Sequence, residues 1–148
     1  MDKAETFIKH NSPAEREAKY AIDKLAQLIP WKDNCNILDI GCGTGNVTHY
    51  ILLPVFPKST KNVIGVDNNK STIEYANKNY GLENKLTFQQ VDVVSDSTFF
   101  ENYEKTFDHI FSFSCLHFVR EQETALNNQH LQNIETRGRF QLLLRGIQ

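Results

Sequence analysis

The sequence has few cysteines, no long hydrophobic run and no excess of charge of one sign. Its three cysteines, among 148 residues, are odd in number and lack a C-x-x-C spacing, which argues against a disulfide framework and against a zinc ribbon. The apolar run 51–56 is short and broken by Pro54, and the N-terminus has no apolar signal-peptide region. These absences predict a protein of the reducing cytoplasm, with no metal site and no membrane partner.

The charged residues are nearly balanced. There are 16 Lys and Arg against 18 Asp and Glu, for a net charge of −2, so the chain offers no basic surface for nucleic acid. A hydrophobic share of 40% is ordinary for a globular protein, and one domain usually has about 100 to 200 residues. We therefore expect a single domain over residues 1–148. The sequence leaves its oligomeric state open.

Apolar stretches of strand length alternate with helical patterns along the chain. This alternation predicts an α/β fold, a Rossmann-like, doubly wound and mainly parallel sheet over core residues 35–144. The first helix, 13–29, begins with a capping box formed by Ser12 and Glu15. The expected strands are 36–40, 62–67, 85–93, 107–114 and 139–144, and the further helices are 46–53, 70–81, 96–103 and 121–135, with Pro54 and Gly81 as stops.

A glycine-rich loop follows the first expected strand. Gly41, Gly43 and Gly45 occupy every second position between that strand and the next helix. Glycine lets the backbone turn tightly and approach a ligand without an intervening side chain. The loop therefore predicts contact with a nucleotide-like molecule, and the alternative is a turn that needs glycine for its own geometry.

Three acids stand at the ends of three successive expected strands. Asp67 lies about 20 residues beyond the loop, where a carboxylate can accept hydrogen bonds from both ribose hydroxyls. Asp92 can accept one from the exocyclic amine of an adenine. Asp39 precedes the loop, where it would repel a pyrophosphate but could pair, directly or through water, with an ammonium group. Each acid alone could be a helix cap or a solvated loop residue.

The spacing of the glycines discriminates between nucleotides. A dinucleotide site has G-x-G-x-x-G with a pyrophosphate on the helix N-terminus, whereas this chain has Asn46 where that spacing requires the third glycine. This disfavours a nicotinamide-dependent oxidoreductase. A ligand with adenine, ribose and an amino acid but no phosphate satisfies all of these features, and S-adenosylmethionine is such a ligand.

Several motifs resemble those of known methyltransferases. Over residues 36–144 the chain resembles class I S-adenosylmethionine-dependent methyltransferases, through "ILDIGCGTG", "VIGVD", "QVD" and "FDHIFSF". Within that class it resembles the insect juvenile hormone acid O-methyltransferases, through "NSPAEREA", Trp31, "YANKNYG" and "FDHIFSFSCLHFVREQETAL". The resemblance implies methylation of a small carboxylic acid such as farnesoic acid or juvenile hormone acid, in juvenile hormone biosynthesis. Two departures concern the acceptor pocket: Phe118 replaces a tryptophan, and "ETRGR" at 135–139 replaces a Pro-Gly-Gly-like turn.

The expected reaction is an in-line displacement in which an acceptor oxygen attacks the methyl group. A carboxylate is already ionised at pH 7, so the site needs alignment and desolvation more than a strong base. His117 would orient the carboxylate, and Trp31, Phe113 and Phe118 would form apolar walls. The expected cofactor-binding residues are Asp39, Gly41, Cys42, Gly43, Gly45, Asp67, Asn68, Asp92, Val93 and Ser112. The alternatives are a structural histidine, aromatic core packing, a strand-ending Ser112 and backbone contact alone from Cys42.

The end of the chain raises a further expectation. The fold that the sequence resembles has seven strands, and here the last two are missing, so 139–144 would form an exposed apolar edge. We therefore expect a C-terminally truncated methyltransferase that is aggregation-prone or self-associated. The alternative function is a catalytically inactive fragment that binds S-adenosylmethionine.

Overall fold

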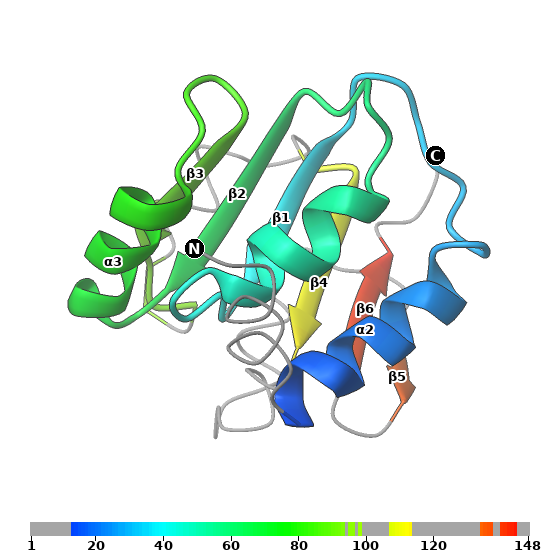
Figure 1. Cartoon of the computed structure of the whole chain (residues 1–148), viewed down its shortest axis with the longest axis horizontal. Coiled ribbons are helices and arrows are strands. Elements are labelled where there is room, and N and C mark those ends of the chain that lie inside the picture. The colour runs from blue at the N-terminus through cyan, green and yellow to red at the C-terminus, as the bar shows by residue number, and fades with distance from the viewer. Residues whose placement is uncertain are drawn as a thin grey trace, which may run out of the picture.

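A six-stranded sheet forms the centre of the molecule (Figure 1). The structure is a computed structural model that describes residues 13–93, 95, 96, 98, 107–113, 134–137 and 140–144, with the backbone alone for 13, 14 and the last two ranges. The strand order is β3-β2-β1-β4-β6-β5, and β3, β2, β1 and β4 are parallel. The strands are β1 Asn36–Ile40, β2 Asn62–Asp67, β3 Leu86–Gln90, β4 His109–Phe113, β5 Ile134–Arg137 and β6 Phe140–Leu144. The predicted α/β fold is confirmed.

The strands differ in burial according to their place in the sheet. Residues 37–40 of β1 and 63–66 of β2 are buried without interruption, as expected for central strands of a parallel sheet. β3 lies at an edge and alternates, with Leu86 and Phe88 buried and Thr87 exposed. β3 ends at Gln90, before the predicted limit, because Asp92 and Asp96 bond to each other in a local turn.

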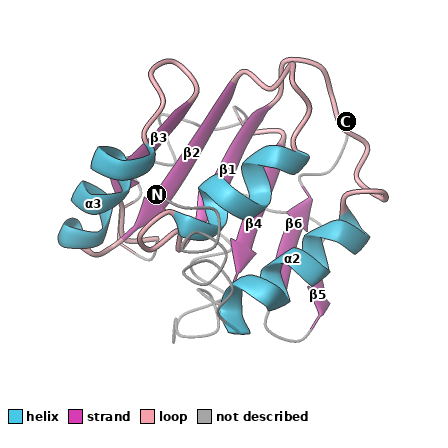
Figure 2. Ribbon diagram, viewed as in Figure 1, coloured by secondary structure: helices cyan, strands magenta, loops and turns pink. Residues whose placement is uncertain are grey.

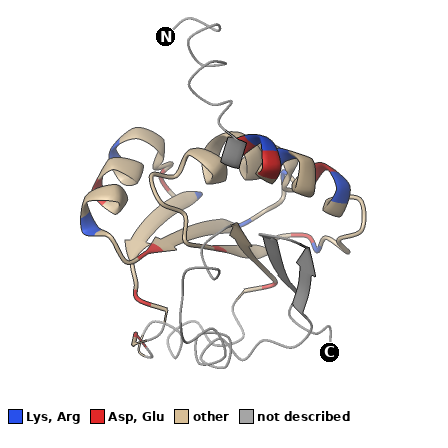
Figure 3. Cartoon of the chain, turned by 90° about the horizontal axis from the view of Figure 1, so that it is seen from below, with Lys and Arg blue, Asp and Glu red and all other residues tan. Residues whose placement is uncertain are grey.

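The described helices lie on one face of the sheet (Figures 2 and 3). They are α2 Pro13–Leu25, the π-helical turn η1 Thr48–Leu52, the 3₁₀ turn η2 Leu53–Val55 and α3 Lys70–Tyr80. α2 ends four residues before the predicted limit, where the chain tightens into a turn and the Trp31 indole donates to the Ala26 carbonyl at 3.1 Å. None of the described helices has the length and apolar character needed to cross a membrane.

Contrary to the prediction, the helical segment does not end at Pro54. Pro54 lies at the start of η2, where proline's missing N–H and fixed φ are tolerated. The chain stays helical through Val55. The prediction of a stop at Pro54 was therefore wrong, because a proline disrupts the interior of a helix and not its first turn.

α3 begins and ends where the sequence predicts. The side chain of Asn69 caps it by accepting from the N–H groups of Ser71 and Thr72. Gly81 follows the last residue with φ −58°, so its role is not a left-handed turn. A side chain at this position would lie 2.7 Å from the Asn77 carbonyl oxygen, and close approach explains the glycine.

The β3 edge is covered by a side chain of α3. The Asn77 amide donates to the Phe88 carbonyl at 2.8 Å and accepts from the Phe88 N–H at 3.0 Å. A single side chain thus pairs both backbone groups that Phe88 presents at the edge. This is one way in which natural sheets avoid an open edge.

At the other end of the sheet, the structure corrects two predictions. Residues 134–137 form β5 and not the end of a helix, and β6 lies between β4 and β5, antiparallel to both. The stretch 139–144 is therefore not the exposed edge that we expected. Ile134 and Thr136 are β-branched and favour extended backbone, and an antiparallel pair needs only the short connection 138–139. The rest of the predicted helix 121–135 and most of 96–103 lie outside the described residues.

Candidate functional site

The glycine-rich loop turns from β1 toward β2 at the edge where the parallel strands end. The N–H groups of Gly41 and Cys42 both donate to the Val66 carbonyl, at 2.7 and 3.0 Å. The next N–H, that of Gly43, donates to Asp67 Oδ2 at 3.0 Å. Three consecutive donors therefore fix the loop against the end of β2. Ligands of open α/β sheets bind at this edge.

All three loop glycines have positive φ, at 73°, 54° and 85°. Gly43 and Gly45 are glycines for different reasons. A Cβ at Gly43 would meet nothing within 4 Å, so the backbone at this point borders open space. A Cβ at Gly45 would lie 2.9 Å from the Phe88 ring and 3.1 Å from Ala76 Cβ. Gly45 is therefore required for packing, and Gly43 leaves room for a ligand.

Asp67 ends β2 and is half-buried beside the loop. One carboxylate oxygen accepts from the Gly43 N–H, and the other accepts from the Asn69 N–H at 3.0 Å. A carboxylate offers about four lone-pair positions, so two bonds leave it able to accept hydroxyl groups as well. The same side chain thus organises the loop and can bind a ligand.

Asp39 is buried, with 2% of its surface exposed. Its Oδ2 accepts from the hydroxyl of Thr48, in η1, at 2.6 Å. Burial raises the pKa of Asp39 to about 7; the Thr48 hydrogen bond opposes this rise and the nearby charge of Asp67 adds to it. At neutral pH the Asp39 carboxyl is therefore divided between its protonated and ionised forms.

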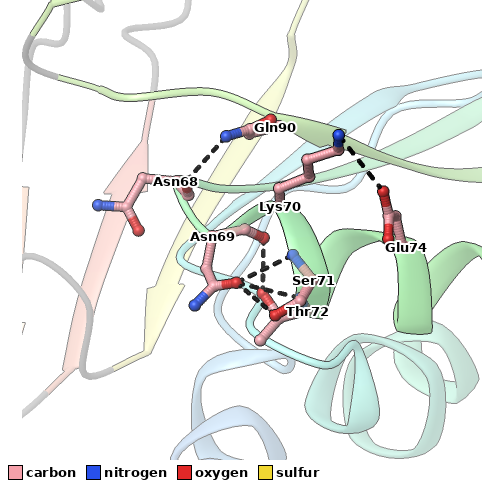
Figure 4. A network of polar contacts seen from close by, with 7 residues as sticks. All are labelled: Asn68, Asn69, Lys70, Ser71, Thr72, Glu74 and Gln90. Atoms are coloured by element: carbon pink, nitrogen blue, oxygen red, sulfur yellow. Dashed lines mark hydrogen bonds and ion pairs between the residues drawn. The ribbon is translucent and has the colours of Figure 1, made fainter.

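The ends of β2 and β3 form a polar rim (Figure 4). The amide of Gln90 donates to the carbonyl of Asn68 at 3.2 Å, which connects the two strand ends. Asn68 and Asp92 are exposed, and Val93 is buried. β3 ends at Gln90, so Asp92 lies two residues beyond the strand and not, as we expected, at its end.

The other expected cofactor contacts lie at the ends of β1 and β4. Ser112 pairs with Ile40 and is buried, and its hydroxyl has no hydrogen-bond partner among the described residues. Phe113, half-buried, follows at the end of β4. Cys42 is buried, with its Cβ near Gly65 and its thiol 3.7 Å from the Gly43 carbonyl, so its side chain faces the core.

Trp31 lies at the opposite end of the sheet. Its ring contacts His109, the first residue of β4, edge to face at a centroid distance of 4.9 Å. It also packs with Phe56 and Phe111. The structure therefore does not bring Trp31 together with the glycine loop, and the Phe111 ring that Trp31 contacts stacks in turn on Phe113.

Thr48 and His109 are among the buried polar residues that sequence reasoning missed. The Thr48 hydroxyl donates a hydrogen bond to Asp39. Thr48 lies three positions beyond Gly45, and this helical spacing is the one sequence signal that could have indicated the contact. His109 is buried on β4, burial lowers its pKa, and neither ring nitrogen has a partner among the described residues. His117 and Phe118 lie outside the described residues. In the part of the chain that is described, no cluster of His, Cys, Asp and Glu could hold a metal ion.

The parallel strands β3, β2, β1 and β4 and the glycine loop that follows β1 define a Rossmann-like α/β domain. Its family follows from sequence comparison: residues 31–142 match the methyltransferase domain family, and the chain belongs to that family. S-adenosylmethionine is the methyl donor of this class, as in an S-adenosylmethionine-dependent methyltransferase from Mesorhizobium loti that matches 76% of the chain with a TM-score of 0.55 at 20% identity.

Two curated relatives share more sequence with the chain. Juvenile hormone acid O-methyltransferase of Bombyx mori is 35% identical over 129 residues, 86% of this chain and 45% of that protein. The protein of the same name from Drosophila melanogaster is 31% identical over 130 residues, 86% of this chain and 43% of that protein. The chain thus spans less than half the length of these relatives.

Solved structures support the fold. The CMeT domain of the citrinin polyketide synthase matches with a TM-score of 0.63 at 23% identity, over 84% of this chain and 34% of that chain. The CurJ carbon methyltransferase matches with a TM-score of 0.62 at 23% identity, over 83% and 34%. At this identity the likeness concerns the fold alone.

Proposed function

We propose that the chain binds S-adenosylmethionine at the carboxyl edge of its sheet and serves methyl transfer to a small carboxylic acid. The observation that carries the cofactor part is the pairing of Asp67 with the Gly43 N–H, next to open space. These residues fit the cofactor: a carboxylate with free lone pairs suits the ribose hydroxyls, and the bare backbone of Gly43 allows close approach.

The remaining contacts are assigned by charge. Asp92 is exposed beyond β3 and is assigned to the adenine amine, with Val93 and Asn68 beside it. Asp39 is assigned to the ammonium group of the amino-acid part, and its negative charge disfavours a pyrophosphate. Ser112 and the loop backbone complete the proposed contacts. This set of residues supports S-adenosylmethionine over a nicotinamide dinucleotide.

The acceptor class is inferred from the two insect relatives, whose name specifies a juvenile hormone acid. The bound cofactor would supply the methyl group. The chain's own work is to orient an acceptor carboxylate, assigned to His117, and to exclude water with apolar side chains. Phe113 suits that wall because it ends β4 beside the loop, whereas the position of Trp31 favours a packing role.

Replacing Asp67 with alanine should weaken binding of S-adenosylhomocysteine, the product form of the cofactor. Each charge-assisted bond lost is worth about 1.5 to 3 kcal/mol, so the Kd should rise at least tenfold. Isothermal calorimetry on the full chain measures this, with S-adenosylmethionine and NAD as further ligands. Asp33→Ala is the matched control, because Asp33 is exposed and bonds only to Ser59 among the described residues.

Two results would remove this assignment. One is an unchanged Kd for Asp67→Ala in a variant that melts as the wild type does. The other is binding of NAD in place of the adenosyl ligands, which would favour the oxidoreductase alternative.

The acceptor is tested by transfer of a labelled methyl group to farnesoic acid or another long-chain acid. His117→Ala should lower the rate at least tenfold and leave the Kd of S-adenosylhomocysteine unchanged, because the residue is assigned to the acceptor alone. Cofactor binding without transfer to any acid would support the alternative of a binding fragment. Transfer to an amine or a nucleic acid would contradict the carboxylate assignment.

A further inference from the structure

Thr48 presents its hydroxyl to the sheet and not to solvent. It is fully buried, at 0% exposure, and lies at the start of the π-helical turn η1 that follows the glycine loop. Its hydroxyl donates to Asp39 Oδ2 at 2.6 Å, within the short range of O–H···O⁻ bonds to a carboxylate. In regular helices a threonine hydroxyl commonly bonds a backbone carbonyl of its own helix. Here it is directed across the core to the strand that leads into the loop.

Among the residues that the structure describes, no cation accompanies the Asp39 carboxylate. On β2 its neighbour in register is Gly65, and on β4 it is Phe111. Among the described residues, Thr48 and the acidic Asp67 are the polar groups that act on it, and none of the ion pairs includes it. A buried carboxylate with one hydroxyl partner and a like charge nearby is poorly stabilised.

We propose that Thr48 is a positioning residue that fixes the Asp39 carboxyl beneath the loop, and that binding of a ligand with an ammonium group releases a proton from Asp39. This inference rests on the proposed function, because the ligand is the adenosyl amino acid assigned to the loop. It adds to that proposal a role for Thr48 and the release of a proton when the ligand binds.

The physical reason is a difference in charge stabilisation between the free and bound states. In the free chain the carboxyl is about half protonated near pH 7. A cation brought close to it in a site of low polarity favours the ionised form, so the proton passes to the buffer. The Thr48 hydroxyl donates to that ionised form and keeps the pKa of Asp39 from rising further. Binding and proton release are then linked.

Calorimetry in buffers of different ionisation enthalpy measures the protons released on binding. With S-adenosylhomocysteine, the wild-type chain should release about half a proton per ligand near pH 7, and the affinity should rise about tenfold from pH 6 to pH 8. Methylthioadenosine has the adenosine and the sulfur but no amino-acid group. It should bind without releasing a proton.

The Thr48 variants test the positioning role. Thr48→Val removes the hydroxyl at nearly constant shape, and it should shift the pH dependence of binding upward by about one to two pH units. Thr48→Ser restores the hydroxyl and should return the midpoint toward that of the wild type. Asp39→Asn should bind with no proton release. Equal pH profiles for Thr48→Val and the wild type would overturn the role of Thr48, even if both bind.

The wild-type chain by itself also tests the proposal, so it does not depend on the folding of any variant. Binding of S-adenosylhomocysteine without proton release would refute the inference and leave the proposed function intact. An absence of binding to either adenosyl amino acid would refute both.

Discussion

Replacing Asp39 with asparagine is expected to stabilise the folded chain at neutral pH and to weaken cofactor binding. In the folded chain the pKa of Asp39 is raised from 3.8 to about 7, so folding favours the protonated form. The stability that this carboxyl contributes is therefore fully present below pH 3.8 and is lost as the pH rises through about 7. Asparagine does not ionise, and its amide oxygen can still accept from Thr48.

The difference in free energy of unfolding between Asp39→Asn and the wild type should grow in favour of the variant by about 2 kcal/mol between pH 5.5 and pH 8. Urea unfolding at several pH values measures this difference. His109 titrates in the opposite sense, because burial lowers its pKa and protonation then destabilises the fold in acid, but it is common to both proteins and cancels in the difference. Asp33→Asn, at an exposed position, is the matched control.

The same variant should bind S-adenosylhomocysteine about ten- to a hundredfold more weakly at pH 8, because a charge-assisted interaction is lost. Opposite effects on stability and binding would mark Asp39 as a residue kept for its site at a cost to the fold. A variant that is less stable than the wild type at pH 8 would contradict the burial argument.

Alanine at Gly45 is expected to damage the fold, whereas alanine at Gly43 should damage the site. At Gly45 the new Cβ would lie 2.9 Å from the Phe88 ring, and φ is +85°. The left-handed backbone costs about 1 to 2 kcal/mol and overpacking about 1 to 3 more. At Gly43, with φ +54° and open space, only the first cost applies.

Urea unfolding and calorimetry on the two variants separate these effects. Gly45→Ala should lose about 2 to 5 kcal/mol of the free energy of unfolding, a large part of the about 5 to 15 kcal/mol of a typical domain. Gly43→Ala should lose no more than about 2 kcal/mol but bind the adenosyl ligands much more weakly, since its methyl group enters the space assigned to them. Normal binding by a folded Gly43→Ala would show that the ligand lies elsewhere.

Local patterns in the sequence predicted the elements near the site well. β1 and β2 are apolar runs of strand length, and α3 has both a capping asparagine and a terminal glycine, so each is specified by neighbouring residues. The same reasoning was wrong at Pro54 and at the end of the sheet, where residues 134–135 were expected in a helix and strand 139–144 at an exposed edge. In the first case the effect of proline depends on its place in a helix, and in the second the strand gains a partner that the local pattern does not show.

The sequence by itself determined the order β1, β2, α3, β3 and β4, the glycine loop and the acids at or just beyond the ends of three of these strands. These features are local, because spacing, propensity and the special backbone angles of glycine act over a few residues. They were sufficient to indicate an adenosyl ligand without phosphate, and the family match agrees with that reading.

Only the tertiary structure decided how the acids differ. Asp67 is half-buried and bonds to two backbone N–H groups, while Asp39 is enclosed and has one hydroxyl partner. It also separated Trp31 from the loop by placing the two at opposite ends of the sheet. Burial and long-range partners arise from strand order and helix packing, and a carboxylate's pKa depends on those surroundings and not on its neighbours in the chain.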